Sequence, residues 1–287
     1  MAESEAAPRA SKKHIYVMLV VIACPVLLVT FVGFLGWPII QFKDSLTQER
    51  KAIEEELNKI RSAGLPVTVE ELDAWYPRVT DDRNAAILLE KAFEAIRTVS
   101  DRSSPVFLLE RVEFPRSDQE LSQDLKTAAA ELVRQNQECL AYVHEALTKE
   151  NCRFPVGFHQ RVETELPHLI KLRCLDNMLA LEALLATDAH DGDGAFAALH
   201  DAVRLPHALA NEPVIVSQLL RCAMLKRFMG TLEWTLGRSH LSESQLQMLQ
   251  DGVTREDDAD VLFKALVGER CCMMEPVARG ALLSDSS

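Results

Sequence analysis

The chain carries no charged residue from Ile15 to Ile40. This run of about 26 residues is longer than the roughly 20 that a helix needs to cross the hydrocarbon core of a bilayer. Tyr16 and Trp37 stand near its two ends, about 32 Å apart along a helix, and amphipathic aromatic rings favour the headgroup level. The sequence therefore predicts an uncleaved transmembrane helix over residues 15–40, with Tyr16 and Trp37 as membrane-interface anchors and bilayer lipid as a partner.

Two other interpretations of the apolar run stay open. The stretch ending in Ala23-Cys24 fits a lipoprotein cleavage pattern, but apolar residues continue after Cys24, where a polar tether is expected. A cleaved signal peptide has an apolar region of only ~7–15 residues. Lys12 and Lys13 precede the run and favour an amino end inside the cytoplasm. We therefore expect a single-pass inner-membrane protein with a short cytoplasmic tail (residues 1–14) and an extracytoplasmic domain.

Charge and cysteine content narrow the classes of partner. The net charge of −12 disfavours binding to the phosphate backbone of nucleic acids. Seven cysteines are irregularly spaced, without a C-x-x-C motif, and a domain of this size does not require disulfides. Because most of them lie in apolar helical surroundings, we expect free, buried thiols, with disulfides as the alternative.

A charged segment over residues 41–63 follows the span. Its apolar residues form a narrow stripe at near-heptad spacing: Leu46, Ile53, Leu57 and Ile60. Arg50 occupies one position of that seam, and a confident coiled coil needs three or four sustained heptads. The pattern predicts a helical stalk, either resting on the domain or forming a homodimer.

Residues 64–80 have the signals of a capped turn. Gly64 and Pro66 end the stalk helix, because glycine suits a left-handed cap and proline cannot continue a helix. Thr68 and Glu71 have the spacing of a capping box, which predicts a short helix through Trp75.

Residues 81–287 carry the repeated apolar spacing of helices, and the predicted fold class is all-α. We expect Asp81 or Asp82 to cap the first helix of this domain and one long helix to run from Asp118 to Lys149. Ser103–Pro115 and Phe154–Phe158 have the composition of extended segments that could pair.

After Pro167 nearly all of the chain has a helical pattern, and antiparallel hairpins are the expected packing. The Pro213–Leu236 helix is apolar around much of its circumference, which predicts a buried, central position. The chain ends soon after a helix, so a C-terminal truncation is a further expectation. The helices predicted after Pro167 are His168–Thr187, Ala195–Asn211, Pro213–Leu236, Ser242–Gly252 and Glu256–Val277.

One hairpin partly matches the tetratricopeptide pattern. The matching large and small residues are Leu179, Ala183, Ala195, Leu199 and Ala202. Glu182 and Ala186 depart from the pattern, and no second copy lies about 34 residues away, although such repeats need about three to be stable. A generic αα-hairpin is the favoured interpretation.

Two short motifs are candidate metal sites, and each is incomplete. Glu165 and His168 have the Glu-x-x-His spacing of di-iron bundles, which need a second copy and two more carboxylates. Asp191-Gly192-Asp193-Gly194 resembles a calcium loop but has Ala189 and His200 where acidic ligands are required. We expect a capped turn between two helices at the second motif.

Histidine and sulfur clusters are equally incomplete as ligand sets. His190, His200 and His207 are close in sequence, without an evident third fixed ligand. The Cys271–Met274 run offers soft sulfur ligands, but four consecutive side chains on a helix point around its whole circumference. The sequence predicts neither a metal site nor a cofactor, and catalytic residues stay unassigned.

Three stretches carry a resemblance: the Gly64–Pro77 turn, Asn84-Ala85-Ala86, and Gly268-Glu269-Arg270-Cys271-Cys272. Together with the basic tail, span and stalk, they look similar to a group of uncharacterised bacterial single-pass, membrane-anchored helical proteins. The resemblance implies a location and a helical fold, without an attached activity.

The leading functional hypothesis is a membrane-tethered helical module that binds another protein or peptide. No Walker loop, dinucleotide fingerprint, G-x-S-x-G or H-E-x-x-H motif occurs in the sequence. An envelope enzyme with a cleft between hairpins and a ligand-sensing domain are the alternatives.

Overall fold

The computed structural model describes residues 47–97, 119–256 and 260–282. The predicted span Ile15–Ile40, its anchors Tyr16 and Trp37, and the segment Ser103–Pro115 lie outside these residues. In the described ranges the fold is all-α and contains no strand, which confirms the predicted class. No helix among the described residues is both long and apolar enough to cross a membrane.

The chain divides into two compact units, residues 1–59 with 279–287 and residues 60–278. The first described helix covers residues 47–62 and accounts for most of the predicted stalk. Leu57 is buried, and Ile53 and Ile60 are partly exposed, whereas Arg50 is exposed. The features that follow belong to the second unit.

Helix α2 (Val69–Trp75) begins as the capping-box spacing predicts. The Thr68 hydroxyl accepts a hydrogen bond from the Glu71 N–H at 3.2 Å. The Glu71 carboxylate in turn accepts one from the Val67 N–H at 2.7 Å, one residue earlier than in the standard box. Gly64 adopts a φ of 76°, as the predicted left-handed cap requires.

The prediction that Asp81 or Asp82 caps the next helix is wrong. These residues form a 3₁₀ turn, η1 (Asp81–Arg83), and Asn84 caps α3 (Ala85–Ala95) by accepting from the Ala86 N–H at 3.1 Å. The Asn84 side chain also pairs with the backbone N–H and C=O of Arg153. Asn84 therefore fixes the 151–158 segment beside α3 through one isolated bridge to Asn151.

The long helix predicted from Asp118 to Lys149 is two helices, α5 (Gln123–Gln135) and α6 (Gln137–Ala146). The break falls at Asn136, which is fully buried. Its side-chain oxygen accepts from the Arg97 N–H at 2.7 Å, and its amide donates to the Arg97 C=O at 2.9 Å. This tie to a distant segment, which periodicity cannot reveal, draws the backbone out of helical geometry.

Helices α7 (Pro167–Asp188) and α8 (Gly192–Arg204) form the expected αα-hairpin. Asp191 caps α8 by accepting from the Gly194 N–H at 2.9 Å, as predicted for this turn. The helix predicted to reach Asn211 stops at Arg204, because Pro206 converts the continuation into the 3₁₀ helix η3 (Leu205–Leu209). The small and large residues matched to the tetratricopeptide pattern are all buried: Leu179, Ala183, Ala195, Leu199 and Ala202.

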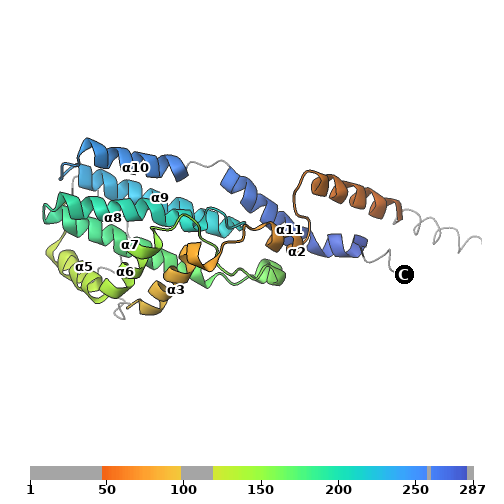
Figure 1. The fold of residues 1–287 in the computed structure, drawn as a ribbon, viewed down its shortest axis with the longest axis horizontal. Coiled ribbons are helices and arrows are strands. Elements are labelled where there is room, and N and C mark those ends of the chain that lie inside the picture. Colours follow the sequence, from red (N-terminus) through yellow and green to blue (C-terminus); the bar gives the residue numbers. More distant parts are fainter. Residues whose placement is uncertain (1–46, 98–118, 257–259, 283–287) are drawn as a thin grey trace, which may run out of the picture. The chain divides into compact units, whose positions relative to one another are not determined.

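Helices α9 (Ile215–Leu236), α10 (Glu243–Glu256) and α11 (Asp260–Leu282) follow. Helix α9 packs on α7 and α8, and α10 packs on α8, so that α7 to α10 run side by side (Figure 1). A helix start predicted at Glu256 is wrong, because Glu256 ends α10. Its carboxylate is held by Arg221 of α9, whose Nε donates to it at 2.7 Å.

Two of the sequence stretches that carry the family resemblance meet in space. On α11, Arg270 donates to the Pro66 C=O at 2.8 Å, and the Cys271 thiol donates to the same oxygen at 3.2 Å. Gly268 lies so close to the Pro213 carbonyl that a side chain there has no room. The Gly268–Cys272 stretch is therefore a packing motif, which docks α11 against the turn before α2 and the start of α9.

Candidate interaction surface

Helix α9 has a buried face that is unusually polar. Eight of its residues are buried, and five of these are polar or charged: Ser217, Gln218, Arg221, Thr231 and Thr235. Each of the five makes a side-chain hydrogen bond inside the domain, such as the 3.0 Å contact between the Thr235 and Thr187 hydroxyls. The Gln218 side chain donates through its Nε2, while its buried Oε1 accepts no hydrogen bond. The remaining three buried residues, Met224, Phe228 and Trp234, supply the apolar packing.

The opposite face of α9 is exposed and largely apolar. We call it the outer face, and it consists of Val216, Leu219, Cys222, Ala223, Lys226, Met229, Glu233 and Leu236. Leu219 is 64% exposed, and Val216, Met229 and Leu236 are 52%, 51% and 46% exposed. Their spacing of three and four residues places them on one stripe about 30 Å long.

The sequence predicted a buried, central helix at 213–236, and the structure buries one side of α9 while leaving the other exposed. An apolar pattern around the circumference identifies a helix that needs neighbours on every side. In α9 the neighbours within the domain, α7, α8 and η3, leave one side of the helix uncovered. Contiguous exposed apolar area of this kind marks interaction sites in soluble domains.

A second exposed apolar group lies on α11. Leu262, Phe263 and Leu266 are 56%, 49% and 52% exposed, and Met273 is 66% exposed. The sulfur run that begins at Cys271 is thus divided, since Cys271 is buried whereas Met273 points to solvent. The run does not present its four side chains to one point.

A buried polar cluster connects the start of α7 with the start of α9. His168 Nε2 lies 3.0 Å from the Glu212 carboxylate, and the Ser217 hydroxyl donates to the same carboxylate. Glu212 and Ser217 are fully buried. The carboxylate stands between the serine and the histidine, so the imidazole does not contact the hydroxyl it would have to deprotonate in a Ser-His-acid triad. The cluster stabilises the turn before α9.

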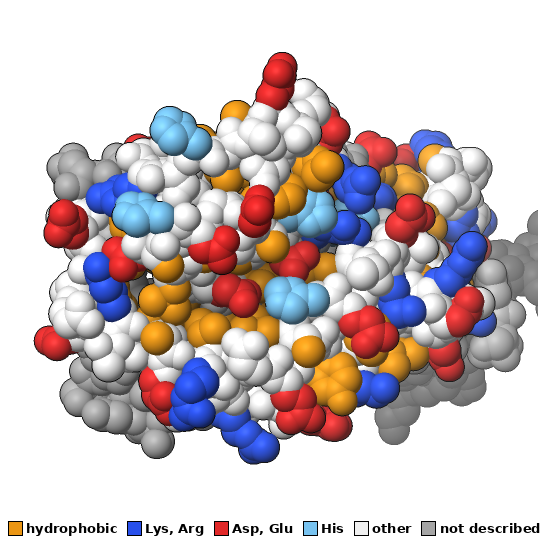
Figure 2. Space-filling view, turned by 60° about the vertical axis from the view of Figure 1, so that its left-hand side comes forward, with side chains coloured by type: hydrophobic (Ala, Val, Ile, Leu, Met, Phe, Trp, Pro, Cys, Tyr) orange, Lys and Arg blue, Asp and Glu red, His pale blue; other side chains and the backbone are white. Residues whose placement is uncertain are grey.

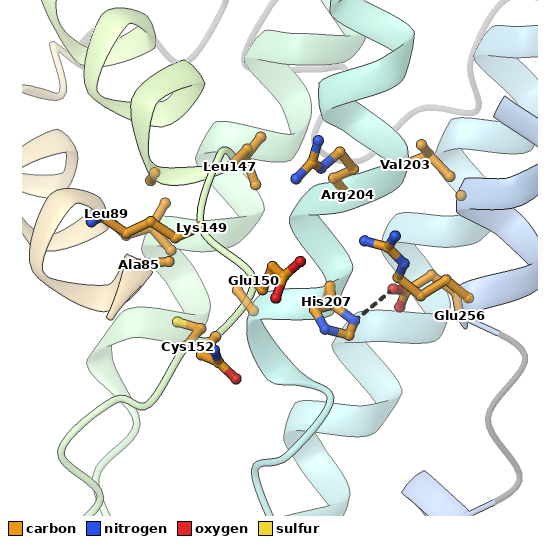
Figure 3. Close-up of a pocket in the computed structure, with 15 residues that line it drawn as sticks. Ala85, Leu89, Leu147, Lys149, Glu150, Cys152, Val203, Arg204, His207 and Glu256 are labelled. Atoms are coloured by element: carbon orange, nitrogen blue, oxygen red, sulfur yellow. Dashed lines mark hydrogen bonds and ion pairs between the residues drawn. The ribbon is translucent and has the colours of Figure 1, made fainter. Parts of the chain in front are cut away.

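The recess drawn in Figure 3 lies beside η3 and α10. His207 Nδ1 contacts the Glu256 carboxylate at 3.1 Å, and Arg221 holds the other oxygen of that carboxylate. Lys149, Glu150 and Arg204 also line the recess. Its cavity volume is about 30 Å³, which is room for water and not for an organic substrate.

A wider surface groove of about 630 Å³ lies between α2 and the 153–159 segment. Its central cation, Arg153, stacks on the Tyr76 ring at 4.1 Å and donates to the Asp73 carboxylate at 2.8 Å. The charge that could bind a ligand is thus already used within the protein. Figure 2 shows a face of the molecule on which hydrophobic side chains lie in a shallow hollow, bordered by acidic, basic and histidine side chains.

The structure separates the residues that the sequence suggested as ligand sets. His168 contacts Glu212, and Glu165 of the same motif is exposed. His207 contacts Glu256, whereas His200 lies 3.9 Å from its neighbour Asp201 and its pKa is lowered by burial. Within the described residues no three histidine, cysteine or acidic side chains converge as a metal-binding group.

The six cysteines of the described region are free, as expected. Cys139, Cys152 and Cys271 are buried, and burial raises the pKa of Cys139 and Cys271 to about 11. Their thiols therefore stay protonated and poorly nucleophilic. The expectation of burial fails for Cys222, which is exposed on the outer face of α9.

Comparison with known proteins gives no match to a family model, to a curated protein or to a solved structure.

Proposed function

We propose that this protein is a membrane-tethered helical module that binds protein through the outer face of α9. The single observation that supports this proposal is the reversed polarity of α9, with polar side chains inward and apolar side chains outward. Exposing Leu219, Val216 and Met229 to water has a free-energy cost that a partner removes, at about 25 cal/mol per Å² of apolar area buried. The predicted span supports the tether.

The chemistry of the described pockets supports binding rather than catalysis. The recess at His207 is too small for a substrate, and the groove at Arg153 has its cation paired. The Glu212 cluster is buried beneath the start of α9.

A photo-reactive amino acid placed at Leu219 in the full chain tests this function in the host membrane. Irradiation should give a discrete cross-linked protein band. The same amino acid at Lys91, an exposed position on α3, is the matched control and should give none. If the two positions give the same pattern, or if neither gives an adduct, the outer face is not a protein-binding surface.

A further inference from the structure

Charge placement on the outer face identifies its partner. Of the eight outer-face residues only two are charged, Lys226 and Glu233. Neither side chain forms a hydrogen bond or ion pair with any other described residue. They are opposite in sign and lie two turns apart, about 10 Å along the same stripe.

The midpoint between these two charges falls between Met229 and Gly230. A Cβ at Gly230 would meet no atom within 4 Å, so this part of the helix is open. Small residues at a helix–helix contact let the backbones approach closely, and helices in contact lie 8–10 Å apart. The middle of the outer face thus combines a flexible apolar side chain, Met229, with space for the neighbouring helix.

We infer that the outer face of α9 binds the same face of a second copy of this chain, antiparallel about a two-fold axis between Met229 and Gly230. The inference rests on the proposed function, because it names the partner of that surface. Under this symmetry Lys226 of each copy faces Glu233 of the other, which gives two equivalent ion pairs. Both charges of the face are then neutralised, Ala223 of each copy faces Leu236 of the other, and Met229 is removed from water.

A partner of different sequence could also cover an apolar stripe. The charge pattern favours a second copy, because in a two-fold contact residue i of one copy meets residue j of the other and j meets i, so that one plus and one minus charge on a single helix pair twice. A parallel arrangement is disfavoured, since it places Lys226 opposite Lys226 and Glu233 opposite Glu233. Antiparallel pairing also separates the two Cys222 residues by roughly 22 Å along the helices.

Charge reversal in the full-length chain, in membrane vesicles or nanodiscs, tests the pairing. Lys226→Glu and Glu233→Lys should each weaken self-association about ten-fold, because two attractive pairs become repulsive. The double variant Lys226→Glu/Glu233→Lys should restore it, since the pairs re-form with their signs exchanged. Lys91→Glu on α3 is the control for general charge effects and should leave self-association unchanged.

Cross-linking gives an independent measurement of orientation. In a Cys24→Ser/Cys222→Ser background, Met229→Cys should cross-link efficiently between two copies with a short bismaleimide. In a Cys24→Ser chain that keeps Cys222, the native Cys222 should not cross-link. Efficient cross-linking through Cys222 would instead indicate a parallel pair and overturn the arrangement.

The outcomes separate this inference from the proposed function. If the double variant fails to restore self-association, or if the chain is monomeric while Leu219 still cross-links to a different protein, the second-copy inference is wrong and the interaction surface stands. If Leu219 cross-links to no protein and the chain is monomeric, both are wrong. Equal melting temperatures of the variants, measured at a dilution where self-association is absent, show that any loss of association is not caused by unfolding.

Discussion

Gly268 is the position where one added methyl group is predicted to be most harmful. An ideal Cβ on this residue would lie 2.8 Å from the carbonyl carbon of Pro213 and 3.1 Å from its Cβ, and closer still to its carbonyl oxygen. Because the obstacle is mainly backbone, it cannot move aside as a flexible side chain would. Gly268→Ala therefore forces α11 away from the start of α9.

Two opposing free-energy terms contribute to the change in stability caused by Gly268→Ala. Alanine is favoured over glycine inside a helix by about 0.8–1.0 kcal/mol. Overpacking against a rigid neighbour costs typically 1–3 kcal/mol and occasionally more. Displacing α11 also stretches the hydrogen bond from the Ile215 N–H to Glu269, now 3.1 Å, and those from Arg270 and Cys271 to Pro66. Weakening of these hydrogen bonds offsets the gain in helix propensity, so we expect a net loss of about 1–3 kcal/mol.

Thermal unfolding followed by circular dichroism measures this loss. In a domain of 150–250 residues each 1 kcal/mol lowers the melting temperature by roughly 2–4 °C, so the expected drop is about 2–12 °C. Gly230→Ala is the matched control, since a Cβ there meets nothing within 4 Å. At a dilution where self-association is absent, it should raise the melting temperature. If Gly268→Ala also raises it, the close packing of α11 on Pro213 is refuted.

Three further substitutions test buried and paired groups. Arg221→Met should cost about 3–5 kcal/mol in urea unfolding by leaving buried Glu256 without its cation, and Arg221→Met/Glu256→Leu should recover most of it. Asn136→Ala should cost about 1–3 kcal/mol in the same assay, because it leaves backbone groups of the segment after α3 unpaired. The hydrogen bond to Asp201 raises the pKa of His144, so its contribution is present below pH 6.5 and is lost as pH rises through the higher folded-state pKa. The melting-temperature difference between the wild-type chain and His144→Asn should therefore be larger at pH 5.5 than at pH 8.5; equal differences would exclude this pairing.

Local signals predicted those elements whose causes are local. The Thr68 cap, the Gly64 turn and the Asp191 cap each depend on residues three or four apart, and all three form as the sequence indicates. Buried positions of α7 and α8 likewise follow from the 3.6-residue period of their apolar residues.

The errors in the predicted helix boundaries have distant causes. Asn136 breaks a helix because it bonds to Arg97, and Asn84 rather than Asp81 caps α3 because it also bonds to Arg153. Neither partner is recognisable from a sequence window, since 39 and 69 residues separate the bonded groups.

Hydrophobic periodicity did not predict the interaction surface on α9, and the reason differs from that for the helix boundaries. Periodicity identifies which residues of α9 are apolar, but it does not say which side of the helix the rest of the protein covers. A helix with both polar and apolar residues around its circumference can pack on the domain through either side. In this protein the side that carries Ser217, Gln218 and Arg221 faces inward. Ser217 and Gln218 find hydrogen-bond partners in Glu212 and Leu209 just before α9, whereas the partner of Arg221, Glu256, lies 35 residues further along the chain.

The reversed polarity of α9 also has a consequence for folding. The buried polar side chains of α9 stabilise the helix only through their hydrogen bonds, because an unpaired buried donor or acceptor costs about 1–3 kcal/mol. Its apolar outer face contributes nothing to the stability of the single chain while water covers it. A second copy adds that missing apolar burial, so the same residues that weaken α9 as part of a monomer favour it as part of a pair. The stability and the self-association of this domain are therefore coupled through one helix. Because pairing covers the outer face, the melting temperature should rise with protein concentration.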